Sequence, residues 1–259
     1  MNLVYNIHYD IAGAFILMIV LGYMLVMYPM KSITIIRYCR VIVLLILSQI
    51  VHVFSSFAIT NSNKVANEVN LALLTIYFGL SFCLEYSYFS YIASFIKDRV
   101  NPKINLINRI VLGIYLGGLV VNLFTGVIFY FDEAHRYCKG PLYYGINLSL
   151  LYYVLLGFTI LMINRRHLNR RQFFSFIFFT FMEISATIVQ TFLIPSILII
   201  LFVSSLTMVI IMFSLETPDY AKLVKTMEDL EKLADLCHKS GISLCLDFVM
   251  NHTGEDHAR

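Results

Sequence analysis

The stretch FFSFIFFTFMEISATIVQTFLIPSILIILFVSSLTMVIIMFSL occupies residues 173–215 and contains a single charged side chain, Glu183. A helical crossing of a hydrocarbon core takes roughly 20 apolar residues, so this stretch is about twice as long as one crossing requires. Pro195 lies near its middle, and proline both interrupts a helix and restricts the residue before it. The pattern therefore predicts two membrane-spanning helices that are joined by a tight turn at Pro195.

Five further apolar stretches of similar length precede this one. The seven predicted spans are Tyr9–Tyr28, Val41–Thr60, Val69–Ile96, Ile110–Tyr130, Tyr143–Ile163, Phe173–Ile194 and Ser196–Leu215. The first is too long for the apolar region of a signal peptide and has no Lys or Arg before it, so we expect it to be retained. The fold class that follows is an all-α membrane protein with seven transmembrane helices.

The basic residues predict the orientation of these spans. No span contains Lys or Arg, and the first, third and fifth loops together hold eleven of them. The N-terminal segment and the other loops hold three. Because cytoplasmic loops carry the excess of positive charge, the N-terminus is expected outside and the C-terminus in the cytoplasm. The predicted location is the inner (plasma) membrane of a bacterial cell, with the lipid bilayer as the main partner.

The charge distribution divides the chain at Leu215. Residues 1–215 hold 14 basic and 7 acidic side chains, whereas residues 216–259 hold 5 and 9. A tail of this length is too short to bury a sizeable core of its own. We therefore divide the chain into a seven-span transmembrane domain at 1–215, a cytoplasmic linker helix at 216–240, and an orphan strand with its tail at 241–259.

Three polar side chains within the spans are candidate site residues. Glu85 and Glu183 are carboxyls in predicted spans, and an ionisable group in a membrane is costly unless it has a function or a partner. Gln190 follows Glu183 by seven residues, which is two helical turns along the same face. Two interpretations stay open, because the carboxyls can lock two helices together or can contact a small ligand. His52 is expected to pack or to form a hydrogen bond.

The sequence indicates no metal site, no cofactor and no nucleic-acid partner. His52 has no second candidate ligand at a related depth, as a haem or metal site would need. Cys138 is the only cysteine in a predicted outer loop, so no outer disulfide framework is expected within one chain. The small ligand suggested by the intramembrane carboxyls is unknown.

The tail begins with a predicted helix. Thr217 and Pro218 suit an N-cap followed by the first helical position. Apolar residues then step by four and three along one seam, at Leu223, Met227, Leu230, Ala234 and Cys237. Such a seam is typical of an amphipathic helix, and it also suits a homodimer through the linker helix. Gly241 is expected to end the helix.

A predicted strand follows this helix. Residues Ile242–Met250 are apolar at nearly every position, which is typical of a strand buried on both faces in a parallel sheet. The sequence predicts no other strand that could pair with it, so we describe it as an orphan.

The end of the membrane domain resembles a known class of signalling protein. The last span continues into Ser214-Leu-Glu-Thr-Pro-Asp-Tyr220. Together with seven spans and an outer N-terminus, this segment resembles the seven-helix sensory regions that precede diguanylate cyclase (GGDEF) or histidine kinase domains in bacteria. The resemblance covers about residues 1–225 and implies a sensory role in signal transduction. No cyclase or kinase signature occurs in the sequence, so we expect the output domain to be lacking.

The tail resembles a different family. The segment Asp247-Phe-Val-Met-Asn251-His252-Thr253 matches the first signature of glycoside hydrolase family 13, the α-amylase family, at the end of the third barrel strand. Over about residues 226–259 it is similar to the amylosucrase-like branch. The resemblance implies that Asp247, Asn251 and His252 are substrate-binding, with His252 on the sugar at the cleavage subsite. The two catalytic carboxylates of such enzymes come from later strands, so no activity is expected from these residues alone.

The two resemblances meet within Thr226–Glu231, a segment that suits either parent. We therefore expect a truncated or chimeric protein, in essence a membrane sensory region that lacks its output domain. A glycoside hydrolase of the α-amylase family, active in carbohydrate metabolism, is the first alternative. A small transporter is the second, although no internal repeat of the transporter kind supports it.

Overall fold

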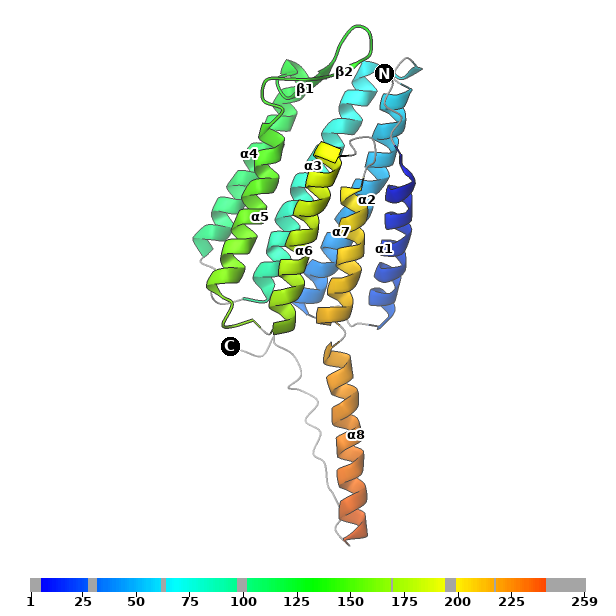
Figure 1. The fold of residues 1–259 in the computed structure, drawn as a ribbon, viewed down its shortest axis with the longest axis vertical. Helices are drawn as coiled ribbons and strands as arrows, with labels where there is room; N and C mark the ends of the chain where they lie inside the picture. Colours follow the sequence, from blue (N-terminus) through cyan, green and yellow to red (C-terminus); the bar gives the residue numbers. More distant parts are fainter. Residues whose placement is uncertain are drawn as a thin grey trace.

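The structure is a computed structural model that describes residues 6–27, 32–61, 64–96, 102–168, 170–193, 199–216 and 218–240. Seven helices lie side by side in a bundle, and an eighth extends away from one end of it (Figure 1). The bundle helices are α1 His8–Met27, α2 Ile33–Thr60, α3 Asn67–Ser94, α4 Pro102–Thr125, α5 Gly145–Ile163, α6 Arg170–Ile188 and α7 Ile200–Ile211. The eighth helix, α8, is Pro218–Lys239.

Four of these helices are long and apolar enough to cross a membrane. They cover His8–Val26, Ile33–Thr60, Asn67–Ser94 and Pro102–Thr125, which correspond to the first four predicted spans. Shorter apolar helical segments lie at Tyr152–Ile163 and Ile200–Ser214, within the predicted fifth and seventh spans. The helical, membrane-compatible character of the body is therefore confirmed.

The long apolar stretch at residues 173–215 forms two helices rather than one. The α6 helix continues into a π-helical turn, η2 (Val189–Leu193), and α7 continues into another, η3 (Met212–Glu216). The two helices pack against each other along the bundle (Figure 1). Pro195 itself lies outside the described residues, as does the predicted strand at 242–250.

The fourth predicted span ends earlier than expected. It was expected to run to Tyr130, but α4 stops at Thr125 and Gly126 adopts a positive φ of 63°. Glycine favours this left-handed conformation because it has no Cβ. The chain then forms a two-stranded antiparallel hairpin from β1 (Phe129–Phe131) and β2 (Tyr137–Lys139). The expectation that the chain has no strand before residue 241 was therefore wrong as well.

Asn122 attaches this hairpin to α4. Its side-chain oxygen accepts hydrogen bonds from the backbone N–H groups of Ile128 (2.7 Å) and Phe129 (3.2 Å). Its amide group donates to the carbonyl oxygen of Phe129 at 3.1 Å. One buried side chain thus satisfies three backbone groups at the start of the hairpin. These bonds leave no periodic signal in the sequence, which explains the error.

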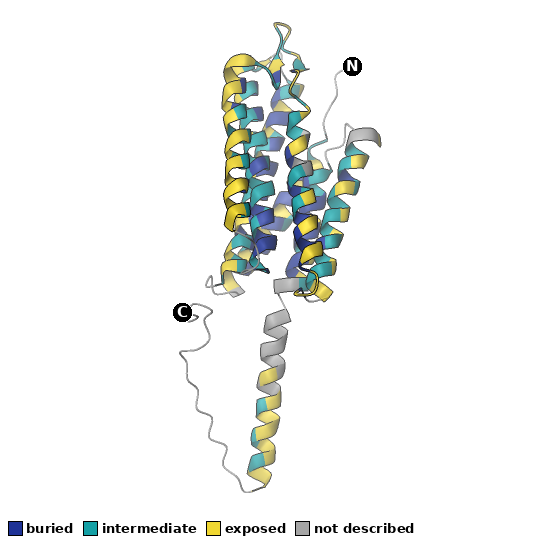
Figure 2. Cartoon of the chain, turned by 90° about the vertical axis from the view of Figure 1, so that its left-hand side faces the viewer, coloured by how far each residue is buried: buried dark blue, intermediate teal, exposed yellow. Residues whose placement is uncertain are grey.

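The exterior of the bundle is apolar as well as its core, which differs from a water-soluble protein. Large apolar side chains face outward, such as Ile19 and Ile114, which are 73% and 66% exposed. Figure 2 shows that buried residues gather on the inner faces of the helices and that exposed residues line the outside. Polar side chains are buried at Asp10, Ser48, Gln49, His52, Ser55, Ser56, Asn70, Ser87, Asn108, Asn122, Ser149, Asn164, Ser204, Ser205 and Thr207. Apolar surface on this scale suits lipid and not water.

Gln49 joins three helices at the centre of this polar interior. Its amide donates to the Ser205 hydroxyl at 2.7 Å and to the Leu201 carbonyl at 3.1 Å, both on α7. Gly13 of α1 lies against the same group, so that a Cβ added at Gly13 would collide with the Gln49 amide and lie 2.9 Å from the Ser205 hydroxyl. The glycine therefore allows α1 to approach α2 and α7 closely.

We predict that Gly13→Ala destabilises the protein, because the added methyl group must displace a fully buried amide from two hydrogen bonds. The expected loss is about 1–3 kcal/mol, measured by thermal unfolding in detergent. Gly22→Ala is the matched control on the same helix, where an added Cβ meets nothing within 4 Å. Equal stability of the two variants would contradict the described packing of α1.

Candidate functional site

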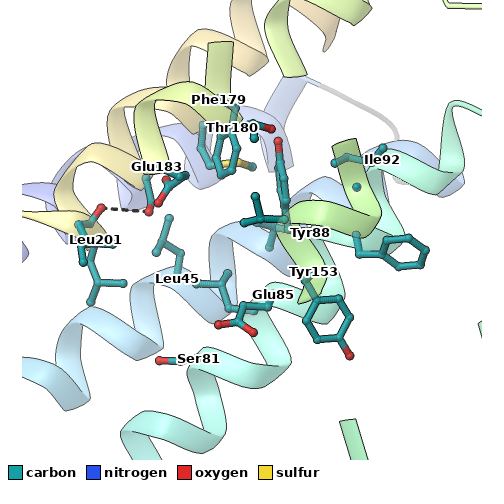
Figure 3. Close-up of a pocket in the computed structure, with 18 of the residues that line it drawn as sticks. Leu45, Ser81, Glu85, Tyr88, Ile92, Tyr153, Phe179, Thr180, Glu183 and Leu201 are labelled. Atoms are coloured by element: carbon teal, nitrogen blue, oxygen red, sulfur yellow. Dashed lines mark hydrogen bonds between the residues drawn. The ribbon is translucent and has the colours of Figure 1, made fainter. Parts of the chain in front are cut away.

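A cavity of about 240 Å³ lies inside the bundle, between α2, α3, α5, α6 and α7 (Figure 3). Its walls are mostly aliphatic and aromatic. The non-aromatic polar side chains in the lining are Ser81, Glu85, Thr180, Glu183 and Ser204. A mostly apolar, concave site with a few convergent polar groups is the usual form of a small-molecule site.

Two of the residues singled out from the sequence lie in this one cavity. Glu85 comes from α3 and Glu183 from α6, and both line its wall (Figure 3). The Ser149 hydroxyl of α5 lies near Glu85, and the Ser204 hydroxyl of α7 lies near Glu183. Each carboxyl therefore has a polar group of a neighbouring helix close to it.

The cavity also contains polar atoms that those bonds leave without a partner. Glu85 Oε2, Glu183 Oε1 and Tyr88 Oη are all buried and form no hydrogen bond within the described structure. A buried polar atom without a partner loses its hydrogen bonds to water, and no hydrogen bond within the protein replaces them. Both earlier interpretations stay open, because each carboxyl lines the cavity and keeps one buried oxygen without a partner.

Aromatic rings form much of the remaining wall. The ring of Tyr88 stacks on Phe179 with a centroid separation of 4.0 Å and an interplanar angle of 24°. Tyr77, Phe78, Phe89 and Tyr153 complete the aromatic part of the lining. The faces of such rings are electron-rich and can attract a cation.

Gln190 has a different position from the one that helical spacing suggests. It lies in η2, and its side-chain oxygen accepts from the backbone N–H groups of Ile199 (2.9 Å) and Ile200 (3.1 Å). Gln190 therefore caps the N-terminus of α7. Gln190 is not among the residues that line the cavity with Glu183.

Sequence reasoning missed a buried acid, Asp10. It lies near the start of the first predicted span and is fully buried, yet only Glu85 and Glu183 were counted as intramembrane acids. His52 Nδ1 and Asp10 Oδ2 form a hydrogen bond of 2.9 Å. The expectation that His52 forms a hydrogen bond is therefore confirmed, and its partner is an acid on α1.

Tyr77 connects this pair to the cavity. Its ring stacks on the His52 ring with centroids 4.5 Å apart and an interplanar angle of 14°. Because Tyr77 also lines the cavity, the Asp10–His52 pair lies directly behind the cavity wall. A sequence signal existed for the pair, namely one acid and one histidine that each stand alone in an apolar stretch.

Over the residues that the structure describes, no group of three or more His, Cys, Asp or Glu side chains is placed to hold a metal ion. Asp247, Asn251 and His252 lie outside the described residues, and their proposed substrate-binding role stays a prediction. The predicted linker helix corresponds to α8, which runs without a break through the Thr226–Glu231 segment.

In the comparison with known proteins, the match lies in the tail. Residues 216–259 match the family model described as alpha amylase, catalytic domain. The match supports the resemblance of the tail to glycoside hydrolase family 13, and it begins about ten residues before the predicted start at 226. No curated protein and no solved structure matches the chain. Because the matched segment is 44 of 259 residues, it does not assign the whole chain to that family.

Proposed function

We propose that residues 1–215 are a membrane sensory domain with seven spans, an outer N-terminus and a cytoplasmic α8. A small ligand occupies the cavity beside Glu85 and Glu183, and its binding shifts α7. The shift passes through η3 into α8, which carries it to an output domain. The observation that carries the proposal is the cavity itself, because it has buried polar atoms without partners and is walled by the helix that leads to α8.

The dimensions of the last two bundle helices support seven spans. With η2, α6 extends over Arg170–Leu193, which is roughly 36 Å at 1.5 Å per residue. With η3, α7 extends over Ile200–Glu216, or roughly 25 Å. Both are comparable with a hydrocarbon core of about 30 Å. In Figure 1, α5, α6 and α7 lie alongside the four longer apolar helices.

The two ends of the bundle differ in the way that the proposed orientation requires. The β1–β2 hairpin lies at one end and α8 extends from the other (Figure 1). The connection between α5 and α6, at the same end as α8, exposes Arg165 and Arg166. Exposed arginines at that end agree with the positive-inside rule.

Contacts to α7 come from several parts of the bundle. Gln49 bonds to Ser205 and to the Leu201 carbonyl, and the Tyr38 hydroxyl donates to the Met208 carbonyl at 2.8 Å. Glu183 contacts α7 through Ser204 from inside the cavity. A change in the cavity therefore acts on a helix whose other polar contacts are all buried, and a packed interior transmits small shifts.

A homodimer through α8 is part of the same proposal. Cys237 is a free thiol on the heptad seam of Leu223, Met227, Leu230, Ala234 and Cys237. Pairing of two α8 helices along this seam would bring the two Cys237 residues close together.

We predict that Gly157→Leu, which adds volume at the cavity wall, changes the rate of Cys237 disulfide crosslinking between two chains in native membranes by about fivefold. Gly118→Leu is the control on α4, where an added Cβ meets nothing within 4 Å. Both variants must first show the same thermal stability in detergent. Identical crosslinking rates in the two variants would refute the coupling of the cavity to α8.

The family match favours a second candidate, in which residues 216–259 belong to an α-amylase-family hydrolase. Such a barrel takes roughly 250 residues, so the matched segment could supply only a small part of it. We predict no turnover of sucrose or α-glucans by this protein purified in detergent. Turnover that His252→Ala abolishes would establish the second candidate and remove the first.

A further inference from the structure

The cavity has two acidic side chains and no basic one. Its lining contains Glu85 and Glu183 but no Lys, Arg or His residue. Each carboxyl has one buried oxygen that no group of the described structure satisfies. Carboxyl groups confined in an apolar interior gain from a counter-charge that is held in the same space. A positively charged group is a partner that suits both oxygens.

The rest of the wall indicates what kind of cation fits. A hydrated or bare inorganic ion needs about six oxygen ligands, and the cavity wall is mainly carbon. Six aromatic residues line it, namely Tyr77, Phe78, Tyr88, Phe89, Tyr153 and Phe179. Aromatic walls stabilise an organic ammonium group through cation–π attraction and bury its apolar substituents.

The hydroxyl of Tyr88 adds a third polar atom without a partner. Its position on the ring that stacks with Phe179 places an acceptor next to an aromatic face, in the same cavity as the two carboxyls. An ammonium group has three donors, and it can therefore satisfy acceptors that a neutral apolar molecule would leave unpaired.

We infer that the cavity binds an organic cation, an amine with a compact apolar body, whose ammonium group is held by Glu85 and Glu183. The inference rests on the proposed function and names the ligand class of the same cavity. The volume of about 240 Å³ suits a molecule with one aromatic ring or a short aliphatic chain.

The test is calorimetric titration of the full chain in lipid nanodiscs with three probes of one shape. These are 2-phenylethylamine, its neutral analogue 2-phenylethanol, and the anion phenylacetate, with empty nanodiscs to subtract partition into lipid. The amine is expected to bind at least about tenfold more tightly than the alcohol, and phenylacetate is expected not to bind.

Variants of the two carboxyls test whether these groups hold the amine. Glu85→Gln and Glu183→Gln keep the side-chain shape, and each is expected to weaken amine binding by at least about tenfold. Glu133→Gln, at an exposed site beside the hairpin, is expected to leave it unchanged. Should both cavity variants fail to fold, the comparison of the three probes on the unmodified protein still tests whether the cavity prefers a cation.

Three results would overturn the inference, namely no binding of the amine, equal binding of the amine and the alcohol, or unchanged binding in both folded Gln variants.

Cys237 crosslinking separates a failure of this inference from a failure of the proposed function. If Gly157→Leu changes crosslinking while the amine does not bind, the sensory role stands and the ligand class is wrong. If the amine binds through the carboxyls but crosslinking never responds, the ligand class stands and the sensory role is wrong.

Discussion

The structure depends on one constraint, namely that each polar group within a hydrocarbon layer must find its partner inside the protein. The bundle meets it by turning polar side chains inward and pairing them between helices. Asp10 of α1 pairs with His52 of α2, and Gln49 of α2 bonds to Ser205 of α7. These contacts, rather than apolar surface that lipid would cover equally well, fix which helices are neighbours.

The same constraint explains why the cavity is a functional candidate. Nine buried polar side-chain atoms of the described residues have no partner, and three of them belong to residues that line the cavity, namely one oxygen each of Glu85 and Glu183 and the hydroxyl of Tyr88. Unpartnered buried groups around one cavity favour a further molecule there. Because α7 forms part of the wall and leads through η3 to α8, a molecule bound there would act on the helix that leads to α8.

Much of the bundle could be predicted from apolar length alone, since each predicted span falls on a helix. The end of α4 could not, because the hairpin after Gly126 depends on three hydrogen bonds of one side chain, Asn122. That Glu85 and Glu183 share a cavity depends on how α3 and α6 pack, and sequence spacing does not report tertiary packing. The bonds of Gln190 to the start of α7 depend on tertiary packing in the same way, and Asp10 was overlooked at the edge of a span.

The central claim is a membrane-spanning body that places the β1–β2 hairpin outside the cell and α8 inside. Its most direct test is maleimide labelling of two variants that keep only Cys138, in β2, or only Cys237, in α8, both of which are free thiols. With a membrane-impermeant reagent on intact spheroplasts, the account predicts that Cys138 is labelled and that Cys237 reacts only after permeabilisation. Labelling of Cys237 in intact spheroplasts, or of both sites equally, would contradict it.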